Sequence, residues 1–520
     1  MAAFVMVRRD SYHDSVLLMR LSQALKGLAG VEDAVVAMGT PHNRELLGAQ
    51  GYAGPALAGA GPNDLVIAVR GAAGAPAAVE AELERLLKAE QPGAADPPAA
   101  GAQVRPPTLA AALRGHPGAN LVLVSVPGEH AAREARRALV LGRHVMLFSD
   151  NVPVEDEIAL KREAVERGLL MMGPDCGTAI IDGRPLAFAN AVRRGPIGVV
   201  GAAGTGIQEI TSLVHRLGGG VSQAIGTGGR DLSEQVGGVM TLLGVAALAV
   251  DPATEVLVVV SKPPAHAVAE KVLAALAATP KPCVVHFVGS EPRVSDERRG
   301  IVFAGSLAEA AEIACRLAGV PGVPHAFTGP DPARVAGLAR HLPRGAALKG
   351  LFCGGTTGQE ALVLLSREGL EVRSNLHKHG PLRVEGVEPG GAARAVPGHV
   401  VLDLGDDVFT RGRPHPMIEP VLRNERLALE MEDPAAVLLL FDCVIGYGSH
   451  ADPAGVLAAG VARAWARRPV VAIASVTGTP EDPQDFNAQV AKLEAAGVVV
   501  EADNRRACAL AAAVLKEVAR

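Results

Sequence analysis

IGVVGAAGTGIQEI (residues 197–210) and GLFCGGTTGQEAL (residues 350–362) are two versions of one pattern. In each stretch, an apolar run meets a turn rich in Gly and Thr and continues into a Gln-Glu pair. Apolar runs of strand length that alternate with helical patterns indicate parallel-sheet units. The sequence therefore predicts two similar α/β units in tandem. Their later landmarks recur in the same order, with DPATEVLVVVSKPP (251–264) matched by DPAAVLLLFDCVIG (433–446) and KPCVVHFVGS (281–290) by RPVVAIASVTGT (468–479).

The Gly-rich turn of each copy lies where a strand is expected to end and a helix to begin. The first amides of a helix have no partner within the helix, and the helix dipole favours negative charge there. We therefore predict that Gly204, Thr205 and Gly206 bind a phosphate or acyl-phosphate group, unless the turn serves packing alone. The equivalent phosphate-binding residues of the second copy are Gly354, Gly355, Thr356 and Thr357.

The composition narrows the class of protein. A chain of 520 residues exceeds what one hydrophobic core usually supports. Hydrophobic residues make up 49% of the chain and aromatic residues 3%, which favours aliphatic layers of the parallel α/β kind. The formal charge of -5 is spread along the chain without a basic stripe, so nucleic acid is not an expected partner.

The cysteine pattern and the hydropathy of the chain indicate in which cellular compartment the protein is expected. Six cysteines are scattered without a CxxC pair, which favours reduced thiols over disulfides or a zinc site. The amino-terminal residues lack the order of a signal peptide. The longest uncharged apolar stretch, residues 236–250, is shorter than the ~20 residues of a spanning helix. We expect a cytoplasmic protein without a membrane segment and without a metal.

The order of the patterns predicts four domains. Short strands and helices alternate in residues 1–95, which predicts a small α+β module of the ferredoxin-like or ACT-like kind. Regular strand and helix patterns in residues 108–190 predict the right-handed crossovers of a Rossmann-like domain. The two repeated lobes occupy residues 191–325 and 326–520. The second lobe has an insertion within residues 371–430, which we expect to be a polar surface loop of functional interest.

Two further Gly-rich loops carry polar residues. The loop GTGGRD (226–231) has an arginine whose planar fork suits a carboxylate or phosphate, although Arg230 and Asp231 can instead pair with each other. In the loop GYGSH (446–450), His450 either titrates near neutrality beside an anion or begins a helix. We expect catalytic roles for Arg230 and His450. The expected phosphate or substrate contacts in these loops are Gly228, Gly229, Asp231, Gly446, Gly448 and Ser449.

Other polar residues lie near expected strand ends. The turn GPDCGT (173–178) closes the Rossmann-like half at a strand's carboxyl end, where open α/β sheets bind ligands. Cys176 in this turn is either a nucleophile with a lowered pKa or an unreactive buried thiol. His377 and His379 alternate without carboxylate partners, so they predict no metal site. The insertion also contains a dense polar cluster between prolines, namely Asp406, Asp407, Arg411, Arg413 and His415.

A family resemblance rests on six short runs in order along the chain, namely MLFSDNV, MGPDCGTAI, GTGIQE, IGTGGRDL, CGGTTGQE and RGRPHPMIEP. Together they resemble the FdrA family of fused relatives of succinyl-CoA synthetase. Residues 120–180 are similar to the later part of the CoA-binding domain of the synthetase α subunit. Residues 197–320 resemble its ligase domain, and residues 345–520 resemble the carboxy-terminal domain of the β subunit. The resemblance implies a multidomain α/β protein with a Rossmann-like CoA-binding-type domain and two flavodoxin-like lobes that share an active site.

The resemblance also implies ligands and partners. The synthetases pass phosphate through a histidine that is absent from RRGIVFAGSL (298–307), and no ATP-grasp domain is recognisable. FdrA-type proteins are associated with purine and allantoin catabolism as a subunit of oxamate carbamoyltransferase, which converts oxalurate and phosphate to oxamate and carbamoyl phosphate. Small-molecule substrates, companion subunits and an oligomer are implied. CoA is a possible cofactor, and the residues expected at its edge of the sheet are Pro127, Asn151, Val152, Pro174, Asp175 and Cys176.

In the carbamoyl-transfer hypothesis, the amides of Thr205 and Gly206 stabilise the tetrahedral intermediate as phosphate attacks the carbamoyl carbon. Arg230 or Arg413 orients the substrate carboxylate, and His415 contacts the substrate. One alternative is an acyl-CoA synthetase of the succinate-CoA ligase (ADP-forming) type that works with a separate nucleotide-binding subunit. Another is a non-catalytic scaffold or regulatory subunit whose amino-terminal module binds a small effector.

Overall fold

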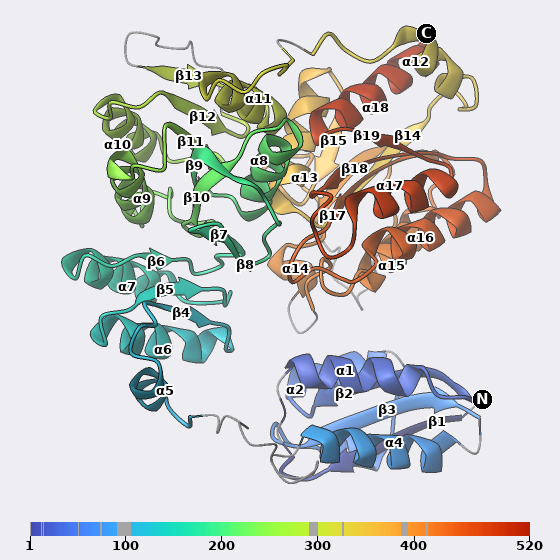
Figure 1. Ribbon diagram of the computed structural model, residues 1–520. Coiled ribbons are helices and arrows are strands. Elements are labelled where there is room, and N and C mark those ends of the chain that lie inside the picture. The colour runs from blue at the N-terminus through green and yellow to red at the C-terminus, as the bar shows by residue number, and fades with distance from the viewer. Residues whose placement is uncertain are drawn as a thin grey trace. The chain divides into compact units, whose positions relative to one another are not determined.

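The described residues form two compact units, one up to Pro106 and one from Pro107 onward (Figure 1). Each unit has hydrophobic cores of its own. Of the described helices, none is both long and apolar enough to cross a membrane. The computed structural model describes residues 2–11, 13, 15–49, 51–72, 75–90, 106–290, 300–324, 327–385, 394–410 and 414–520.

The first unit is a small α+β domain on a three-stranded antiparallel sheet. Its strand order is β1-β3-β2, and β3 runs antiparallel to both neighbours. This split β-α-β arrangement is the ferredoxin-like pattern that the sequence predicted. Leu21, Leu25 and Leu83 of the helices are buried with Ile67 and Val69 of the central strand. The elements are β1 (Ala2–Arg8), α1 (Ser15–Lys26), β2 (Val31–Met38), α2 (Pro41–Ala49), α3 (Pro55–Ala58), β3 (Leu65–Gly71) and α4 (Ala75–Glu90).

The second unit begins with a three-stranded parallel sheet in the order β4-β5-β6. Its helices are amphipathic because their apolar residues recur at helical spacing. Ala131, Ala135 and Leu139 of α6 are buried with Val145 and Leu147 of β5. The elements of this Rossmann-like half are α5 (Leu109–Gly115), β4 (Leu121–Val124), α6 (Gly128–Val140), β5 (His144–Leu147), α7 (Val154–Glu166) and β6 (Met171–Met172).

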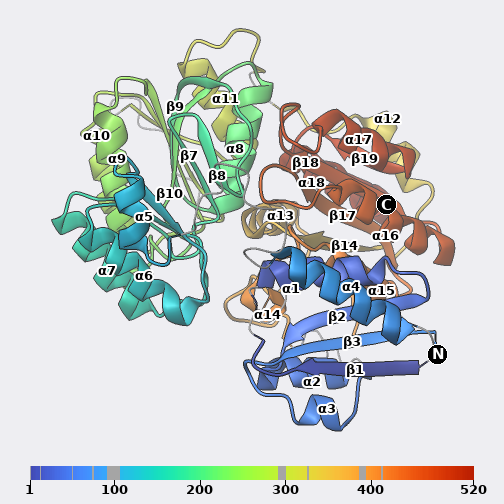
Figure 2. The same ribbon diagram turned by 60° about the horizontal axis from the view of Figure 1, so that its bottom comes forward.

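The first lobe is a seven-stranded sheet in the order β13-β12-β11-β9-β10-β7-β8. Strands β9 to β13 are parallel, whereas β7 and β8 form an antiparallel hairpin. One face packs on α8 and α11, and the other packs on α9 and α10 (Figure 2). The elements are β7 (Thr178–Ile181), β8 (Arg184–Ala187), β9 (Arg194–Ala202), α8 (Gly204–Arg216), β10 (Val221–Gly226), α9 (Val239–Val250), β11 (Val256–Ser261), α10 (His266–Ala277), β12 (Cys283–Phe287), β13 (Ile301–Phe303) and α11 (Leu307–Leu317).

The second lobe is a six-stranded, fully parallel sheet in the order β15-β16-β14-β17-β18-β19. Helices cover both of its faces, as in the first lobe. The elements are α12 (Pro332–Ala339), β14 (Ala347–Phe352), α13 (Gly355–Arg367), β15 (Val372–Ser374), β16 (His399–Asp403), α14 (Asp407–Thr410), α15 (Val421–Glu430), β17 (Ala436–Val444), α16 (Pro453–Arg467), β18 (Val471–Thr477), α17 (Phe486–Ala495), β19 (Val498–Glu501) and α18 (Asn504–Ala519).

The two lobes share one strand order. The series β13-β12-β11-β9 of the first lobe corresponds to β19-β18-β17-β14 of the second. Helices α8 and α13 follow the corresponding strands β9 and β14, and both begin at a glycine of the repeated turn. The fold therefore contains the two similar doubly wound lobes that the duplicated sequence predicted.

Two details of the predicted organisation need correction. The hairpin β7–β8 lies inside residues 108–190, yet it belongs to the sheet of the first lobe because Ile180 pairs with Ala224 of β10. The insertion of the second lobe is also more than a surface loop. It supplies β16, whose Val400 and Leu402 are fully buried between β14 and β15.

The lobes pack against each other through buried polar contacts. The Asn190 side-chain amide donates to Ile445 O (2.8 Å) and to Asp482 Oδ2 (2.7 Å). The amide of Tyr447 donates to Ala189 O (2.8 Å). Helices α8 and α13 also contact each other at this junction (Figures 1 and 2). A buried polar group that loses its partner is costly, so these bonds fix how the two lobes are joined.

Candidate functional site

The first turns of α8 and α13 meet at the junction of the two lobes. The Thr205 hydroxyl accepts a hydrogen bond from the amide of Thr356 (3.1 Å), and both residues are buried. A Cβ atom at Gly354 would lie only 2.8 Å from Thr205 Cγ2, so the two turns are in close contact. The structure therefore brings the two predicted anion-binding turns together at the carboxyl ends of their strands, where open α/β sheets bind ligands.

Lys262 and Asp403 flank the beginning of α13. A Cβ atom at Gly355 would lie 2.7 Å from Asp403 Oδ2 and 3.1 Å from Lys262 Nζ, so only glycine leaves room for both groups. The sheet register explains their position. Ser261 pairs with Ala202, which places Lys262 beside the start of α8, and Asp403 pairs with Phe352 at the end of β14.

Sequence analysis missed both of these residues. Lys262 falls within the repeated landmark SKPP, and Asp403 ends the apolar run HVVLD of the insertion. The signal that could have found them is a charged residue directly after, or at the end of, a buried strand. Lys262 forms no ion pair with another described residue.

Two carboxyl groups near Lys262 have raised pKa values. Burial raises the pKa of Asp403 to about 6, although Lys262 opposes the shift. Desolvation by the surrounding protein raises the pKa of Asp175 to about 6 as well, again against the effect of Lys262, and part of the residue is exposed to solvent. Carboxyl groups whose pKa values are raised toward neutral pH and that lie near a cation are candidates for general acid or base catalysis.

His415 lies close to Asp403 and is a neutral hydrogen-bond donor. Burial lowers the pKa of His415 to about 4. Its Nδ1 accepts from the amide of Met417 (3.2 Å), so the neutral ring carries its proton on Nε2. The ring packs against Phe188, with centroids 5.7 Å apart. The Nε2 atom faces Gly405, where a Cβ atom would lie 2.6 Å away.

The second-lobe turn is already occupied by a protein carboxylate. Asp442 accepts from the amides of Cys353 (Oδ1, 2.8 Å) and Gly354 (Oδ2, 2.8 Å) and from the Thr357 hydroxyl (2.8 Å). Together with the bond from Thr356 to Thr205, these contacts use most donors of the turn. The prediction that Gly354, Thr356 and Thr357 bind an external phosphate therefore needs correction.

The loop 226–231 serves packing. Asp231 is fully buried and accepts from Lys161 Nζ (2.7 Å) and from the amide and hydroxyl of Thr241 (2.8 and 2.7 Å). Arg230 donates to Glu157 Oε2 (3.0 Å) and to the carbonyl oxygen of Val152 (2.7 Å). Substrate binding by Asp231 and the alternative pairing of Arg230 with Asp231 are both wrong, because each residue has another partner.

The glycines of this loop also have structural roles. Gly228 has a φ of +87°, and a Cβ atom there would lie 2.3 Å from Pro174 O. A Cβ atom at Gly229 would lie 3.5 Å from Asp175 Oδ2. The loop therefore packs on the turn 173–176 and contacts the Asp175 side chain. Gly228 and Gly229 position this carboxylate and need not contact an anion themselves.

The loop 446–450 faces the first lobe, and its histidine lies just before the N-cap residue of α16. A Cβ atom at Gly446 would lie 2.7 Å from Ala189 O, and one at Gly448 would lie 2.9 Å from the Phe188 ring. His450 Nδ1 accepts from the amide of Asp452 (3.0 Å), which is the N-cap residue of α16. Ser449 Oγ is buried without a hydrogen-bond partner among the described residues.

The residues expected to bind CoA do not present a favourable phosphate site. Pro127 and Pro153 precede α6 and α7, and the first turns of these helices carry Glu129 on α6 and Glu155, Asp156 and Glu157 on α7. Negative charge at a helix start repels phosphate. Asn151 has a positive φ, and the carbonyl of Val152 is engaged by Arg230. Glu129, Glu155 and Asp156 at these helix starts are therefore unfavourable for the CoA phosphates, whereas Glu157 is paired with Lys161 and Arg230.

Cys176 is an unreactive buried thiol. Burial raises the pKa of Cys176 to about 12, and its Sγ contacts the carbonyl oxygen of Gly226 (3.4 Å). Because the thiolate is the reactive form, a nucleophilic role is excluded near neutral pH. The arginines of the predicted insertion cluster, Arg411 and Arg413, lie outside the described residues.

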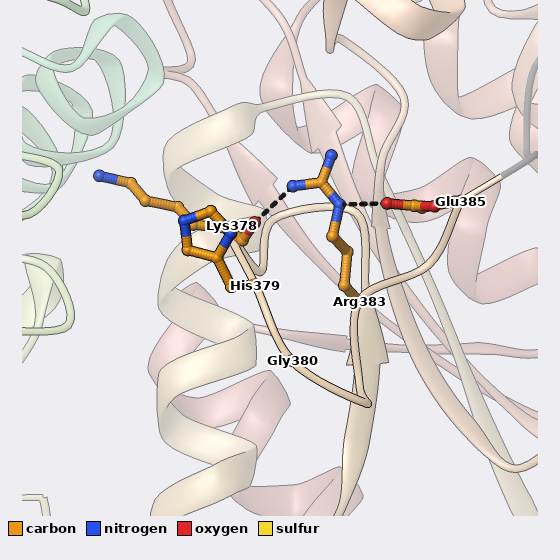
Figure 3. Close-up of a pocket in the computed structure, with 5 residues that line it drawn as sticks. All are labelled: Lys378, His379, Gly380, Arg383 and Glu385. Carbon is orange, nitrogen blue, oxygen red and sulfur yellow. Dashed lines mark hydrogen bonds and ion pairs between the residues drawn. The ribbon is translucent and has the colours of Figure 1, made fainter.

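A separate surface pocket is lined by Lys378, His379, Gly380, Arg383 and Glu385 (Figure 3). Arg383 is tied to Glu385 Oε1 (3.0 Å) and to the carbonyl oxygen of Lys378 (2.6 Å). The Lys378 side chain extends away from Arg383 (Figure 3). Among the residues that the structure describes, no three His, Cys, Asp or Glu side chains gather where they could hold a metal ion.

Comparison with known proteins identifies the family. The Escherichia coli (strain K12) "Uncharacterized protein YahF" is 43% identical over 509 residues, which cover 96% of each chain. The chain belongs to the YahF family. Three family models also match, namely "AllF, heavy metal-associated domain" over residues 1–103, "CoA binding domain" over residues 192–289 and "CoA-ligase" over residues 351–514. The YahF-family chain is therefore CoA-ligase-like, and its relatives with named activities are enzymes.

A more distant relative agrees with this assignment. The Trichomonas vaginalis "Succinate--CoA ligase [ADP-forming] subunit alpha-2, mitochondrial" is 28% identical over 149 residues, which are 28% of this chain and 47% of that protein. A solved acetyl-coenzyme A synthetase 1 of Ca. Korarchaeum cryptofilum is 15% identical with a TM-score of 0.32, covering 76% and 82% of the two chains. At that TM-score, the structural likeness is too distant to indicate an activity.

Two of the matched family models can be compared with the residues of this chain. The CoA binding model falls on the first lobe, whereas the resemblance placed the CoA-binding-type domain at residues 108–190. The heavy metal-associated model covers residues 1–103, yet the first cysteine of the chain is Cys176. Soft metals are usually held by thiolates. The amino-terminal domain therefore has no thiol with which to bind a heavy metal.

Proposed function

We propose that this protein catalyses phosphate-linked carbamoyl transfer of the oxamate carbamoyltransferase type, as a cytoplasmic subunit that assembles with companion subunits. One observation carries the proposal: Lys262 and the carboxyl group of Asp403 flank the start of α13, which contacts the start of α8 at the junction of two CoA-ligase-like lobes. The AllF-type amino-terminal domain supports a connection to allantoin breakdown. The lack of a histidine in residues 298–307 argues against a phosphohistidine relay there.

The reaction needs three kinds of group, and the site contains each. A phosphate oxygen attacks the carbamoyl carbon of oxalurate, the bond from that carbon to the inner nitrogen breaks, and this nitrogen takes a proton to become the amide of oxamate. The ammonium of Lys262 attracts the anionic reactants. The amides at Thr205 and Gly206 stabilise the developing oxyanion. Asp403 or Asp175, each with a pKa of about 6, supplies the proton.

The structure changes which cation orients the substrate. Arg230 was expected in this role, but it is bound to Glu157 and to the carbonyl of Val152. Lys262 lies beside the start of α13 instead. We assign it to the substrate carboxylate or to phosphate, where a point charge suffices.

The test is formation of carbamoyl phosphate from oxalurate and labelled phosphate by the purified chain with its companion subunits. Lys262→Met is expected to lower the rate at least tenfold. Lys271→Met, which removes an exposed lysine of the neighbouring helix α10, is the matched control and is expected to leave the rate unchanged. Absence of carbamoyl phosphate in the wild-type assay contradicts the proposal.

The same preparation tests the acyl-CoA synthetase alternative, which the CoA-ligase model favours. That alternative predicts that ADP is formed from ATP when CoA and a dicarboxylate are both present. The unfavourable charge at the starts of α6 and α7 argues against it. A scaffold role is favoured instead if companion subunits are fully active with a Lys262→Met chain.

A further inference from the structure

Helix α9 of the first lobe has a second apolar face, which points away from the sheet. The buried residues of its inner face are Met240, Thr241, Gly244, Val245 and Leu248. The opposite side carries what we call the outer stripe, made of Val239, Leu242, Leu243, Ala246 and Val250. These positions recur at the spacing of a helix face that packs on another helix. Helix α10 lies beside α9 and does not cover the outer stripe (Figures 1 and 2).

The outer stripe is both exposed and uncharged. None of the 12 residues of α9 is charged, although charged residues make up 20% of the chain. Ala246 is exposed, and Val250 is 82% exposed. The single polar side chain of the helix, Thr241, is buried and donates its hydroxyl to Asp231 (2.7 Å). A helix that is apolar on all sides is normally buried. The outer stripe is therefore a surface that needs a cover.

The neighbouring helix α7 extends this apolar surface. Lys161 of α7 and Thr241 of α9 both donate to Asp231, each at 2.7 Å, so the side of α7 that carries Lys161 faces α9. Val165 follows Lys161 by one helical turn on that side and is 45% exposed. The apolar surface thus continues from α9 onto the end of α7.

The outer stripe is complementary to itself when two copies of α9 run antiparallel. Its first half carries the large side chains of Leu242 and Leu243, and its second half carries the small Ala246. A two-fold axis at the middle of the helix sets the two leucines against Ala246 of the other copy, and Val239 against Val250. Large residues opposite small ones let helices interdigitate. A parallel pair would instead set leucines against leucines.

The charge at the end of α9 favours the same direction. Asp251 is the C-cap residue of the helix. In an antiparallel pair, this carboxylate lies near the N-terminal end of the other helix, where the helix dipole favours negative charge. In a parallel pair, the two Asp251 carboxylates would lie side by side and repel each other. Because α9 itself is uncharged, the pair buries no ion of either helix.

We propose that the outer stripe of α9 binds the outer stripe of a second copy of this chain, in a two-fold antiparallel helix pair that makes the protein a dimer. None of these residues belongs to the site around Lys262 and Asp403. The inference therefore does not depend on the proposed function.

The first test is the association of the full-length chain, measured by sedimentation equilibrium. The wild type is expected to dimerise, and Ala246→Glu is expected to raise the dissociation constant of the dimer at least tenfold. Ala462→Glu, at an exposed alanine of α16, is the matched control and is expected to leave it unchanged. A monomeric wild type, or equal association by Ala246→Glu, overturns the proposal, and so does a dimer that persists while Ala246→Glu loses a companion subunit.

A charge-swap mixture covers the case in which Ala246→Glu merely unfolds the helix. Ala246→Lys is expected to stay monomeric by itself, because like charges meet near the two-fold axis. An equimolar mixture of Ala246→Glu and Ala246→Lys is expected to form a heterodimer, because opposite charges then meet. Two folded variants that remain monomeric in the mixture overturn the proposal, with folding checked by circular dichroism.

Cysteine substitutions test the direction of the helix pair. All six native cysteines are buried, so an introduced surface thiol is the accessible one. Ala246→Cys lies near the axis and is expected to form a covalent dimer when diamide oxidises the two thiols. The two copies of position 250 are about 16 Å apart in an antiparallel pair, so Val250→Cys is expected to form none. A covalent dimer of Val250→Cys, or none of Ala246→Cys, overturns the antiparallel pair.

Discussion

At the scale of single residues, burial decides which charged groups are structural and which are available for chemistry. Asp231 and Lys161 are fully buried and paired, whereas Lys262 is partly exposed and makes no ion pair with a described residue. In the sequence, Asp231 follows a Gly-rich turn and Lys262 follows a strand, so position alone does not show which of the two is paired. Only the packing around them separates a buried ion pair, which is expensive to break, from a group held ready for a ligand.

Asp231→Asn is expected to destabilise the protein by about 3 kcal/mol, because it leaves the Lys161 ammonium buried beside a single remaining carboxylate, Glu157. The measurement is the free energy of unfolding in urea. Asp182→Asn is the matched control, since its ion pair with Arg194 is exposed; we expect a change within about 0.5 kcal/mol there. Equal effects of the two substitutions would contradict the buried assignment.

Anion affinity is expected to rise as the pH falls through about 6. The pKa values of Asp403 and Asp175 are both raised to about 6, so both carboxyls are charged at pH 7.5 and neutral at pH 5. Neutral carboxyls leave the Lys262 charge uncompensated, which favours an anion. Sulfate, whose charge is constant in this range, is a suitable probe in a competition assay. The other charged groups that act on these two carboxyls are Asp150, Arg230, Asp406, Asp407 and Asp442.

Asp403→Asn gives this pH prediction a sharp control. The variant is expected to bind sulfate at pH 7.5 more nearly as the wild type does at pH 5, with a smaller dependence on pH. An affinity that falls on acidification, or an unchanged pH dependence in Asp403→Asn, would show that another group titrates.

At the scale of elements, the register between parallel strands assembles the site. The pairing of Ser261 with Ala202 and of Phe352 with Asp403 places charged residues beside the starts of α8 and α13. Strand β16, which carries Asp403, belongs to the insertion within residues 371–430. The polar composition of this insertion predicted a surface loop. Its buried run HVVLD is short, and a run of that length does not by itself distinguish a central strand from a loop.

Gly355→Ala is expected to abolish most activity while the protein stays folded. The added methyl would lie 2.7 Å from Asp403 Oδ2 and 3.1 Å from Lys262 Nζ and would displace both side chains. Gly337→Ala in α12 is the matched control, because its nearest neighbour is the flexible end of Arg340 at 3.6 Å. That variant is expected to gain about 0.5–1 kcal/mol from helix propensity. Wild-type activity of Gly355→Ala would exclude close approach at this point.

At the scale of the whole molecule, the duplicated lobes are joined by buried polar groups that the repeats themselves supply. Glu360 of the second Gln-Glu pair accepts from the amide of Leu307 in the first lobe (2.6 Å) and from Asn504 (2.8 Å). Glu209 of the first pair contacts Thr477 and Asn504 of the second lobe. The Gln-Glu motif that identified the duplication therefore stabilises the junction and does not take part in the site.

The stability of the junction is expected to fall as the pH rises. Burial raises the pKa of Glu360 to about 7. The stabilisation that comes from its protonated form is thus complete below about pH 4.5 and is lost as the pH rises through 7. Thermal unfolding should show a lower melting temperature at pH 8 than at pH 5.5. In Glu360→Gln this difference should shrink, and an unchanged difference would exclude Glu360 as its cause.

Much of the fold follows from the sequence alone. The repeated apolar runs, the alternation of strands and helices and the glycines at strand ends are local features, and local features determine secondary structure and its order. They predicted the small α+β module, the parallel sheets, the two lobes and the Gly-rich turns, whereas the meeting of the lobes at a shared site was implied by the family resemblance. The predicted anion role of the first-lobe turn remains a proposal that the geometry supports.

The tertiary structure alone decided which residues of those turns are free. Asp442 fills the second turn, Arg230 and Asp231 bind different partners, and Lys262 with Asp403 enters the site from strands far apart in the sequence. Such contacts depend on strand register and on the packing of one lobe against the other. Neither is encoded in any short stretch of sequence, because hydrogen-bond partners and burial are properties of residues brought together only after the chain has folded.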